Sequence, residues 1–411
     1  MFGRPGPRKL SSCLPGTYSF SLCLVKEKEV LRLLVISSCS DAWGGSEELW
    51  SGAALELLGQ GHQVRVLKTT VDNQHGTVKR LQAAGCPVID LEATPSWGTR
   101  LTNRLLPTSR QTTLRAYGCQ VIRQALTRFQ PSLVVVSQGC NFDGVEFAAE
   151  CLAQNVPYVL VCQKAIDFFF PPAHQRHQAQ EVYRGALRCY FVSEHNRQLT
   201  QWQLGFELPQ AQVIRNPFQV PFQGELPFPG GEVLRLACVA RLNLLDKGQD
   251  ILLRVLAQPH WQERPVHVTL FGSGPDRLAI EEMAAMLGVR NLTLGGQVAD
   301  ISQVWATHHA LVLPSRSEGL PLALVEAMLC GRPAIITAAG GNAELVLDNE
   351  TGFLAAAATP EALDEALERA WDHREHWGAM GQRAAAYARQ QTVPHPARYF
   401  ADCLLRERVL V

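Results

Sequence analysis

The stretch LRLLVISSCSDAWGGSEELWSGAALELLGQGHQVRVL, from Leu31 to Leu67, indicates the fold of this chain. It opens on an apolar run, Leu31–Ser37, and passes through Gly44 and Gly45 into a segment whose leucines, alanines and tryptophan recur at helical spacing. The glycine turn GQGH ends that helix, and Gln63–Leu67 forms a second short apolar run. Apolar strands that alternate with amphipathic helices are typical of a parallel sheet covered on both faces.

The same alternation continues along the chain and then restarts. The segment Asn216–Glu232, NPFQVPFQGELPFPGGE, contains four prolines and three glycines without periodicity, which indicates a linker. We expect further strands before it at residues 87–91, 132–137, 157–162, 189–193 and 212–215, and after it at 234–239, 266–271, 292–294, 309–314 and 333–337. The pattern predicts two Rossmann-like, doubly wound α/β domains that face a cleft, with ligands beyond the carboxyl ends of the strands.

The predicted domains are followed and preceded by shorter segments. An apolar stretch, Leu10–Val25, follows three basic residues, but Pro15 and Gly16 divide it and no small-residue cleavage pattern closes it. We therefore expect a disordered extension rather than an export signal. The expected organisation is an extension at 1–30, a first Rossmann-like domain at 31–215, a linker at 216–232, a second Rossmann-like domain at 233–390, and a C-terminal helix at 391–411 that packs back across the domain join.

Composition excludes several classes of protein. Of the 411 residues, 46% are hydrophobic, which is enough for large cores and argues against a disordered chain. Lys plus Arg and Asp plus Glu number 38 each, so the chain has none of the basic excess typical of nucleic-acid binding. The 12 cysteines form no C-x-x-C pair, which argues against a zinc ribbon or redox motif and favours reduced thiols in the cytoplasm. No apolar run reaches the roughly 18 residues that a membrane span needs.

The strongest candidate site is Ser315–Gly331, SRSEGLPLALVEAMLCG. Pro321 suits the first turn of a helix and Gly331 its C′ position, so we expect a helix from about Pro321 to Cys330. Its one charged residue, Glu326, stands among apolar residues, and a helix that is apolar all round is buried. A buried carboxylate needs donors, which either the protein or the hydroxyl pair of a ribose can supply.

Other charged residues lie at predicted strand ends. Glu318 precedes the helix just described, where exposed N–H groups and the helix dipole favour anions. Arg241 follows a strand and Lys247 is expected to start the next helix, so the two cations could hold a diphosphate. Gly272, in the motif FGSGPD, follows another strand and could bring backbone N–H groups near a phosphate. The alternatives are a helix-capping Glu318, a structural Glu326 and ordinary surface charges.

Together these motifs resemble family-4 retaining glycosyltransferases of the GT-B architecture. The resemblance runs from about Leu31 to Gln390 and is strongest over Leu234–Leu354. The first domain contributes GGSEELWSGAALELLGQGHQVRVL, FVSEHNRQLTQWQLG and QVIRNP. The second contributes, in family order, VARL…DKGQDIL, LFGSGP, LGGQV, VLPSRSEGLPLALVEAMLCGRPAI and GGNAELVLDNETGFL.

The resemblance implies a function and a role for particular residues. It implies that the first domain, 31–215, is the acceptor side and that the second domain, 233–390, binds the nucleotide sugar. The reaction is transfer of a sugar, with retention, from a nucleotide-diphosphate-sugar donor to a hydroxyl acceptor (a glycan, a lipid-linked molecule or a small molecule). It needs no cofactor, and the absence of a D-x-D pair agrees with a metal-independent mechanism. Arg241 and Lys247 would bind the diphosphate, Glu326 the ribose, and Glu318 with the N–H groups of Gly319 and Leu320 the sugar and phosphate. Residues close to the donor phosphates or flanking its base would be Gly44, Gly45, Gly272, Gln297 and Val298.

One position departs from the family pattern. The family usually carries a histidine at the end of the strand that reads VPYVLVCQKA here, and this chain has Gln163 there. A glutamine can donate a hydrogen bond but cannot act as a base. Either the leaving phosphate takes the acceptor's proton, or Lys164, Asp143 or His195 substitutes. Of these, we expect His195, in SEHN, to be a helix-start residue rather than a catalyst.

The segment 93–142 has a strong charge bias. It contains no acidic residue but six arginines, Arg100, Arg104, Arg110, Arg115, Arg123 and Arg128, interleaved with tryptophan and leucine. We expect a surface for an anionic acceptor or for anionic membrane headgroups, with the enzyme peripheral at the inner face of the membrane. The alternative is a solvated helical face.

Two other functions remain open. A sugar phosphorylase or a nucleotide-sugar epimerase could use the same architecture, although a pyridoxal-phosphate phosphorylase needs a dedicated lysine and a much longer chain. A catalytically weak or silent nucleotide-sugar-binding protein is the alternative from another class, since Gln163 replaces the usual histidine. Neither the donor base, the sugar nor the acceptor follows from the sequence.

Overall fold

The first half of the chain forms a seven-stranded sheet. A computed structural model describes residues 30–92 and 114–407. In the helix that begins at Leu114, the side chains are described from Tyr117 onward. All strand pairs of this sheet are parallel, in the order β3-β2-β1-β4-β5-β6-β7. The strands are β1 (Arg32–Ser37), β2 (Gln63–Lys68), β3 (Val88–Asp90), β4 (Leu133–Gln138), β5 (Tyr158–Cys162), β6 (Arg188–Phe191) and β7 (Ala211–Val213).

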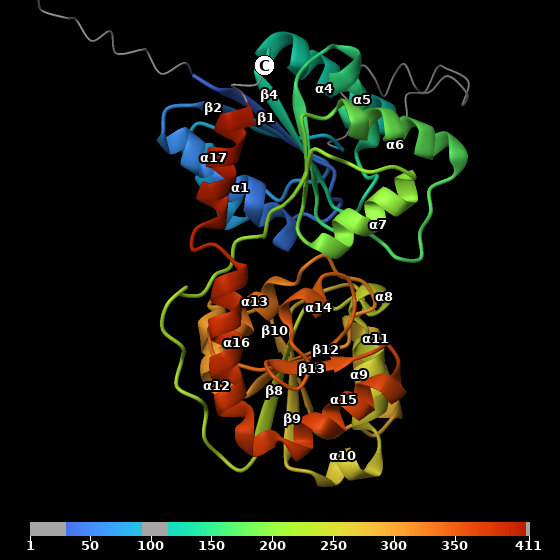
Figure 1. The fold of residues 1–411 in the computed structure, drawn as a ribbon, viewed down its shortest axis with the longest axis vertical. Helices are drawn as coiled ribbons and strands as arrows, with labels where there is room; N and C mark the ends of the chain where they lie inside the picture. Colours follow the sequence, from blue (N-terminus) through green and yellow to red (C-terminus); the bar gives the residue numbers. More distant parts are fainter. Residues whose placement is uncertain (1–29, 93–113, 408–411) are drawn as a thin grey trace, which may run out of the picture. The chain divides into compact units, whose positions relative to one another are not determined.

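Helices cover both faces of this first sheet because successive side chains of a strand point to opposite faces, and both sets are apolar. Leu33 and Val35 of β1 belong to the core beneath α1, α2 and the C-terminal helix α17, whereas Leu34 and Ile36 belong to the core beneath α4, α5 and α6. Figure 1 shows α1 and α17 on one side of β1 and β4, with α5 and α6 on the other. The helices are α1 (Gly45–Gly59), α2 (Gly76–Ala83), α4 (Leu114–Phe129), α5 (Val145–Ala153), α6 (Ala173–Gly185), α7 (Glu194–Leu204) and α17 (Pro396–Glu407).

The second half forms a six-stranded parallel sheet in the order β10-β9-β8-β11-β12-β13. Its strands are β8 (Leu234–Val239), β9 (Val266–Phe271), β10 (Leu292–Gly296), β11 (Ala310–Leu313), β12 (Ala334–Thr337) and β13 (Gly352–Ala355). Its helices are α8 (Leu244–Lys247), α9 (Gln249–Leu256), α10 (Pro259–Glu263), α11 (Arg277–Met286), α12 (Ile301–Thr307), α13 (Leu322–Leu329), α14 (Asn342–Leu345), α15 (Pro360–Asp372) and α16 (Trp377–Gln391). In this half α9 packs against α11 and α15, and α13 packs against α16 (Figure 1).

The predicted architecture of two doubly wound parallel-sheet domains is confirmed. Each sheet reverses its strand order beside its first strand, β1 or β8, and the crevices of doubly wound sheets lie at such reversals. One local expectation is wrong: Lys247 ends the short helix α8 instead of starting a helix, because Gly248, with φ of 62°, separates it from α9. The C-terminal helix α17 packs on α1, with Phe400 fully buried and Glu407 paired to Arg188.

Part of the predicted organisation falls outside the described residues. The N-terminal extension does so except for Val30, as do Arg100, Arg104 and Arg110 of the arginine-rich segment. Within the described part, Arg123 on α4 has an acidic partner, Glu150 on α5, at 2.8 Å. None of the helices in the described part combines the length and the apolar character that crossing a bilayer requires.

Candidate functional site

A cavity of about 740 Å³ lies at the carboxyl ends of the strands, and both sheets contribute to its lining. Its walls include the loops after β1, β4 and β5 and those after β8, β9, β10 and β11, all within the compact unit Leu31–Val411. The volume falls in the range of small-molecule and cofactor sites. The structure places every predicted site residue on this wall: Gly44, Gly45, Gln163, Arg241, Lys247, Gly272, Gln297, Val298, Glu318, Gly319, Leu320 and Glu326.

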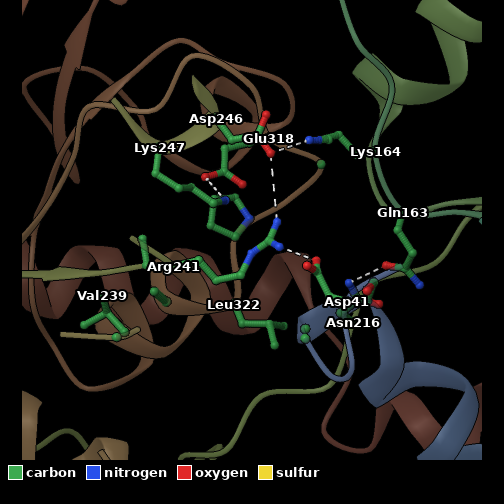
Figure 2. A pocket seen from close by; sticks show the side chains of 18 of the residues that line it. Asp41, Gln163, Lys164, Asn216, Val239, Arg241, Asp246, Lys247, Glu318 and Leu322 are labelled. Carbon is green, nitrogen blue, oxygen red and sulfur yellow. Dashed lines mark hydrogen bonds and ion pairs between the residues drawn. The ribbon is translucent and has the colours of Figure 1, made fainter. Parts of the chain in front are cut away.

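The two predicted diphosphate-binding cations reach the cavity from adjacent turns. Arg241 lies two residues beyond β8, and Lys247 lies at the end of α8. The Lys247 Nζ atom is 2.6 Å from Glu318 Oε1, and the Ser315 hydroxyl donates to the same oxygen at 2.7 Å. Arg241 forms an ion pair with Asp41, from the loop after β1 (Figure 2). Both cations are therefore held by carboxylates at the cavity wall.

Backbone contacts explain why Lys247 lies beside the Glu318 loop, residues 314–321 between β11 and α13. The carbonyl of Asp246 accepts hydrogen bonds from the N–H groups of Arg316 and Ser317, at 2.8 and 3.1 Å. Gly248 lies so close to the loop that a Cβ atom on it would be 2.1 Å from the Pro314 carbonyl oxygen. The segments after β8 and β11 are thus joined by their main chains.

Glycines allow the Glu318 loop to be packed from two further sides. A Cβ atom on Gly319 would stand 1.8 Å from the carbonyl oxygen of Gln163, so this position has no room for another residue. Gly340, with φ of 54°, approaches the Glu318 carbonyl, and the N–H of Gly341 donates to the Gly319 carbonyl at 2.8 Å. The glycine turn Ala338–Glu344, AAGGNAE, therefore packs against the main chain of Glu318 and Gly319 and holds it in place.

Glu326 is buried on α13, as its sequence context predicts. Its side chain belongs to a helix whose residues from Ala323 to Leu329 are all buried, and it is 5% exposed at the cavity wall. The backbone N–H of Gln219 donates to its Oε1 atom at 2.9 Å. Burial raises the pKa of Glu326 to about 7, despite this hydrogen bond, from an ordinary value near 4.5. Protein donors therefore satisfy the carboxylate only in part.

Gln163, in place of the family's usual histidine, is fixed by one neighbour. Its Oε1 atom accepts a hydrogen bond from the Asn216 side chain at 2.7 Å, while its buried Nε2 atom has no partner among the described residues. A buried amide N–H group without an acceptor is a candidate donor to a bound molecule.

The possible substitutes for the missing histidine differ in position. Lys164 lines the cavity and pairs with Asp246 at 2.9 Å, and Asp143 lines it as well. His195 does not contribute to the lining; it is the second residue of α7 and lies 2.9 Å from Asp167. Its hydrogen bond with Asp167 raises the pKa of His195. The geometry favours the interpretation of His195 as a helix-start residue.

The remaining predicted residues lie around the same cavity. Gly44 precedes the first residue of α1, Gly45, so the N-terminal end of this 15-residue helix faces the cavity wall. A Cβ atom on Gly272 would be 2.1 Å from the Ala240 carbonyl oxygen, so packing between loops by itself requires this glycine. Gln297 donates to the Ser273 hydroxyl at 2.8 Å, and Val298 is partly exposed.

Three lining residues were not identified from the sequence. They are Asp41, Asp246 and Asn216, the partners of Arg241, Lys164 and Gln163. Asp41 stands beyond the first strand, a position that the strand-end rule could have indicated. Its pairing with a residue 200 positions away has no local signal in the sequence.

Two doubly wound parallel sheets, with a cavity at the carboxyl ends of their strands, define the GT-B architecture. The profile described as "Glycosyl transferases group 1" matches residues 234–373, and "Glycosyl transferase 4-like domain" matches residues 44–217. The chain belongs to the family-4 type glycosyltransferases.

Curated relatives match about a third of this chain. D-rhamnosyltransferase WbpZ of Pseudomonas aeruginosa is 33% identical over 149 residues, which are 35% of this chain and 38% of that protein. The GDP-mannose-dependent alpha-(1-6)-phosphatidylinositol monomannoside mannosyltransferase of Mycolicibacterium smegmatis is 29% identical over 143 residues, 32% of this chain and 37% of that protein. The matched region thus spans well under half of either relative.

Solved structures match nearly the whole chain. Anabaena HepE in complex with UDP superposes with a TM-score of 0.69 and 19% identity, over 92% of this chain and all of that one. The sucrose-phosphate synthase of Thermosynechococcus elongatus has a TM-score of 0.69 and 17% identity, over 92% and 98% of the two chains. At these identities the likeness establishes the fold.

Proposed function

We propose that this protein is a retaining glycosyltransferase that moves a hexose-type sugar from a nucleotide-diphosphate donor to a hydroxyl acceptor without a metal ion. The observation that carries the proposal is the arrangement of Arg241, Lys247, Glu318 and Glu326 around one cavity at the strand ends. The family membership and the polysaccharide-related names of some relatives support a role in polysaccharide biosynthesis.

In the proposed reaction the bond between the sugar and the diphosphate breaks as the acceptor oxygen attacks from the same face. Negative charge develops on the leaving diphosphate, and Arg241 and Lys247 stabilise it. Glu326 binds the ribose hydroxyls, and Glu318 with the N–H groups of Gly319 and Leu320 binds the sugar and phosphate. Gly44, Gly45 and Gly272 lie by the phosphates, and Gln297 and Val298 flank the base. The positive end of α1 adds to the favourable field for the anion.

Gln163 has a positioning part in this reaction. Its unpaired Nε2–H group, buried at the cavity wall, is suited to donate to a hydroxyl of the transferred sugar. Because an amide takes up no proton at neutral pH, the acceptor's proton passes to an oxygen of the departing phosphate.

The first prediction is that nucleoside diphosphates stabilise the protein against heat. Binding to the folded state alone adds about 2.7 kcal/mol to the free energy of unfolding when the ligand is at 100 times its dissociation constant. A thermal-shift screen of UDP, GDP, ADP and dTDP, each beside its free nucleoside, should raise the melting temperature for one diphosphate more than for its nucleoside. Equal melting temperatures with and without every diphosphate contradict the donor assignment.

A second candidate function is a catalytically weak or silent nucleotide-sugar-binding protein. The observation in its favour is Gln163, which provides no base. Incubation with the nucleotide sugar selected by the screen separates the two functions. Release of the nucleoside diphosphate, by hydrolysis or by transfer to a set of acceptors, supports the enzyme, whereas binding without release supports the silent protein.

We further propose that the arginine-rich segment 93–142 faces a lipid-linked or otherwise anionic acceptor, at the inner face of the cytoplasmic membrane. Each arginine near an anionic surface contributes about 1 kcal/mol, screened by salt over roughly 8–10 Å. Glu150 supplies a counter-charge to Arg123, so the proposed attraction to an anionic surface comes from the other arginines.

The second prediction follows from this charge. The protein should sediment with vesicles containing phosphatidylglycerol at low salt, and reversal of Arg100, Arg104 and Arg110 to glutamate should abolish this binding while nucleotide binding is retained. Reversal of Arg254, Arg277 and Arg290, which lie in the second half of the chain, is the control. A parent protein that stays in the supernatant at low salt eliminates the membrane contact.

A further inference from the structure

The cation that should hold the donor diphosphate already has an anionic partner. Arg241 pairs with Asp41, and the side chains of both residues are 43% exposed (Figure 2). A second carboxylate, Asp246, is 3.9 Å from Arg241, but it is also bound to Lys164 at 2.9 Å. Asp41 is thus the carboxylate in direct contact with Arg241, and a phosphate oxygen that binds the same Nη1 atom has to replace it there.

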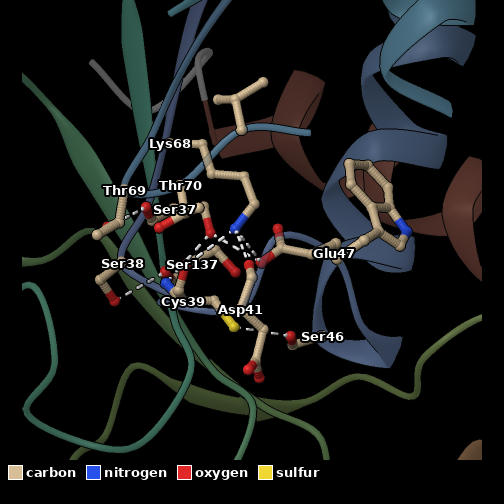
Figure 3. A network of polar contacts seen from close by, with 12 residues as sticks. Ser37, Ser38, Cys39, Asp41, Ser46, Glu47, Lys68, Thr69, Thr70 and Ser137 are labelled. Atoms are coloured by element: carbon tan, nitrogen blue, oxygen red, sulfur yellow. Dashed lines mark hydrogen bonds and ion pairs between the residues drawn. The ribbon is translucent and has the colours of Figure 1, made fainter. Parts of the chain in front are cut away.

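A buried lysine holds the loop that bears Asp41. Lys68, at the end of β2, is fully buried, and its ammonium group donates to the carbonyls of Cys39 and Asp41 at 2.9 and 2.7 Å. It also lies 3.3 Å from Oε1 of Glu47, which is fully buried on α1 (Figure 3). These three acceptors match the three N–H bonds of an ammonium group.

Glu47 is held in turn on two further sides. Its Oε1 atom accepts from the Ser37 hydroxyl at 3.0 Å, and its other oxygen accepts from the Trp50 indole N–H. Two buried charges are costly, and an apolar pair of similar volume is often at least as stabilising. Stability alone therefore does not explain this pair. The contacts of Lys68 with the carbonyls of Cys39 and Asp41 indicate that the pair positions the loop that bears Asp41.

We propose that Asp41, positioned by Lys68 and Glu47, competes with the donor diphosphate for Arg241 and so limits how tightly and how long a nucleoside diphosphate is held. This proposal rests on the proposed function, in which Arg241 binds the diphosphate. An exposed ion pair contributes little net free energy because water screens it, so exchange of Asp41 for a phosphate is feasible. The departing product leaves as Asp41 returns to Arg241.

Neutralising Asp41 should therefore strengthen the binding of nucleoside diphosphates. The Asp41→Asn variant should bind UDP or GDP, whichever the parent binds, on the order of fivefold more tightly, with most of the change in the dissociation rate. Uridine and guanosine should bind the parent and the variant alike, because they lack the phosphates that compete for Arg241. Asp41→Glu, which keeps the charge, should resemble the parent.

A matched control separates competition for Arg241 from a general loss of negative charge. Asp72, in the loop after β2, is an exposed carboxylate outside the cavity wall, and it accepts a hydrogen bond from the N–H of Gln74 at 2.8 Å. Asp72→Asn should leave UDP and GDP affinity within twofold of the parent. An equal gain in Asp72→Asn and Asp41→Asn overturns the proposal.

The remaining outcomes distinguish this proposal from the proposed function. Unchanged or weaker diphosphate binding in Asp41→Asn overturns the competition while leaving the glycosyltransferase function intact. If parent and variant both fail to bind UDP, GDP, ADP and dTDP, then both proposals fail. Faster release of UDP or GDP from Asp41→Asn than from the parent also overturns the competition.

The anchoring role of Lys68 is tested by a double-mutant cycle. Replacing both buried charges, as Lys68→Met with Glu47→Gln, should tighten UDP or GDP binding in the parent background and have no further effect together with Asp41→Asn. An equal effect in both backgrounds shows that the pair does not act through Asp41. If the paired variant does not fold, Asp41→Asn and Asp72→Asn still decide the competition itself.

Discussion

Replacing Lys247 with alanine is expected to lower turnover of the nucleotide-sugar donor by about two orders of magnitude or more, as loss of one preorganised charge-stabilising group typically does. The side chain of Lys247 lies at the cavity wall and is only 17% exposed, so water replaces its ammonium group poorly. The substitution also leaves Glu318, which is 6% exposed, without its cationic partner. Initial rates of nucleoside diphosphate release measure the effect.

Two comparisons make the Lys247 result specific. The free nucleoside should bind Lys247→Ala and the parent alike, because it lacks the phosphates. Lys79→Ala, which removes an exposed lysine on α2, should retain full turnover. If Lys247→Ala turns over at the parental rate, Lys247 does not stabilise the leaving group.

The Glu326→Gln substitution is expected to weaken nucleotide binding and, at the same time, to stabilise the free protein at neutral and alkaline pH. The carboxylate is the proposed acceptor for the ribose hydroxyls, so its loss should reduce affinity for the nucleoside and the diphosphate alike. Burial that raises the pKa of Glu326 to about 7 means that the ionised form is disfavoured in the folded protein. Glutamine has the same shape and lacks that penalty.

The pH dependence of this effect has a definite sign. Below the unfolded pKa, near 4.5, Glu326 is protonated in both states and the penalty is absent. Between pH 4.5 and about 7 the unfolded chain ionises while the folded one stays protonated, so the free energy of unfolding falls as pH rises. Above about pH 7 the penalty is complete, on the order of 3 kcal/mol. Glu326→Gln should remove this slope.

Denaturant unfolding from pH 5 to pH 9 tests the predicted stability, and nucleotide titrations over the same range test the predicted affinity. For the parent, affinity should rise with pH through about 7, since the ionised carboxylate is the better acceptor, and the variant should lack this rise. Glu281→Gln, at an exposed position on α11, is the control. Undiminished nucleotide binding by Glu326→Gln would falsify the ribose assignment.

The sequence by itself determined the architecture and indicated the candidate residues that lie on the cavity wall, but not Asp41, Asp246 and Asn216. Strand-length apolar runs and helical periodicity are local properties, and they are strong in this chain because both sheets are buried on both faces. Candidate residues follow from the same pattern, since a polar residue after a parallel strand lies at the carboxyl edge of its sheet. For this reason Arg241 could be placed at the cavity without coordinates, whereas Glu318 was placed from its position at a helix N-terminus and Gln163 from the resemblance to the glycosyltransferase family.

Glu326 could be recognised as a buried carboxylate from its helix alone. The apolar residues on every side of it leave no solvent-facing stripe, and a charge in such a helix must be buried. Which donor meets it could not be inferred. Gln219 lies 107 positions earlier in the chain, in a segment that shows no periodicity.

Only the tertiary structure decided which charges are paired. Arg241 with Asp41, Lys164 with Asp246 and Lys68 with Glu47 each join residues brought together by loops or by different secondary elements. The same holds for Gly319, whose need for glycine comes from the main chain of Gln163 and not from its own turn. Ion pairs and close backbone approaches depend on distances of a few ångströms between segments far apart in the chain, and the spacing of residues within one segment carries no information about them.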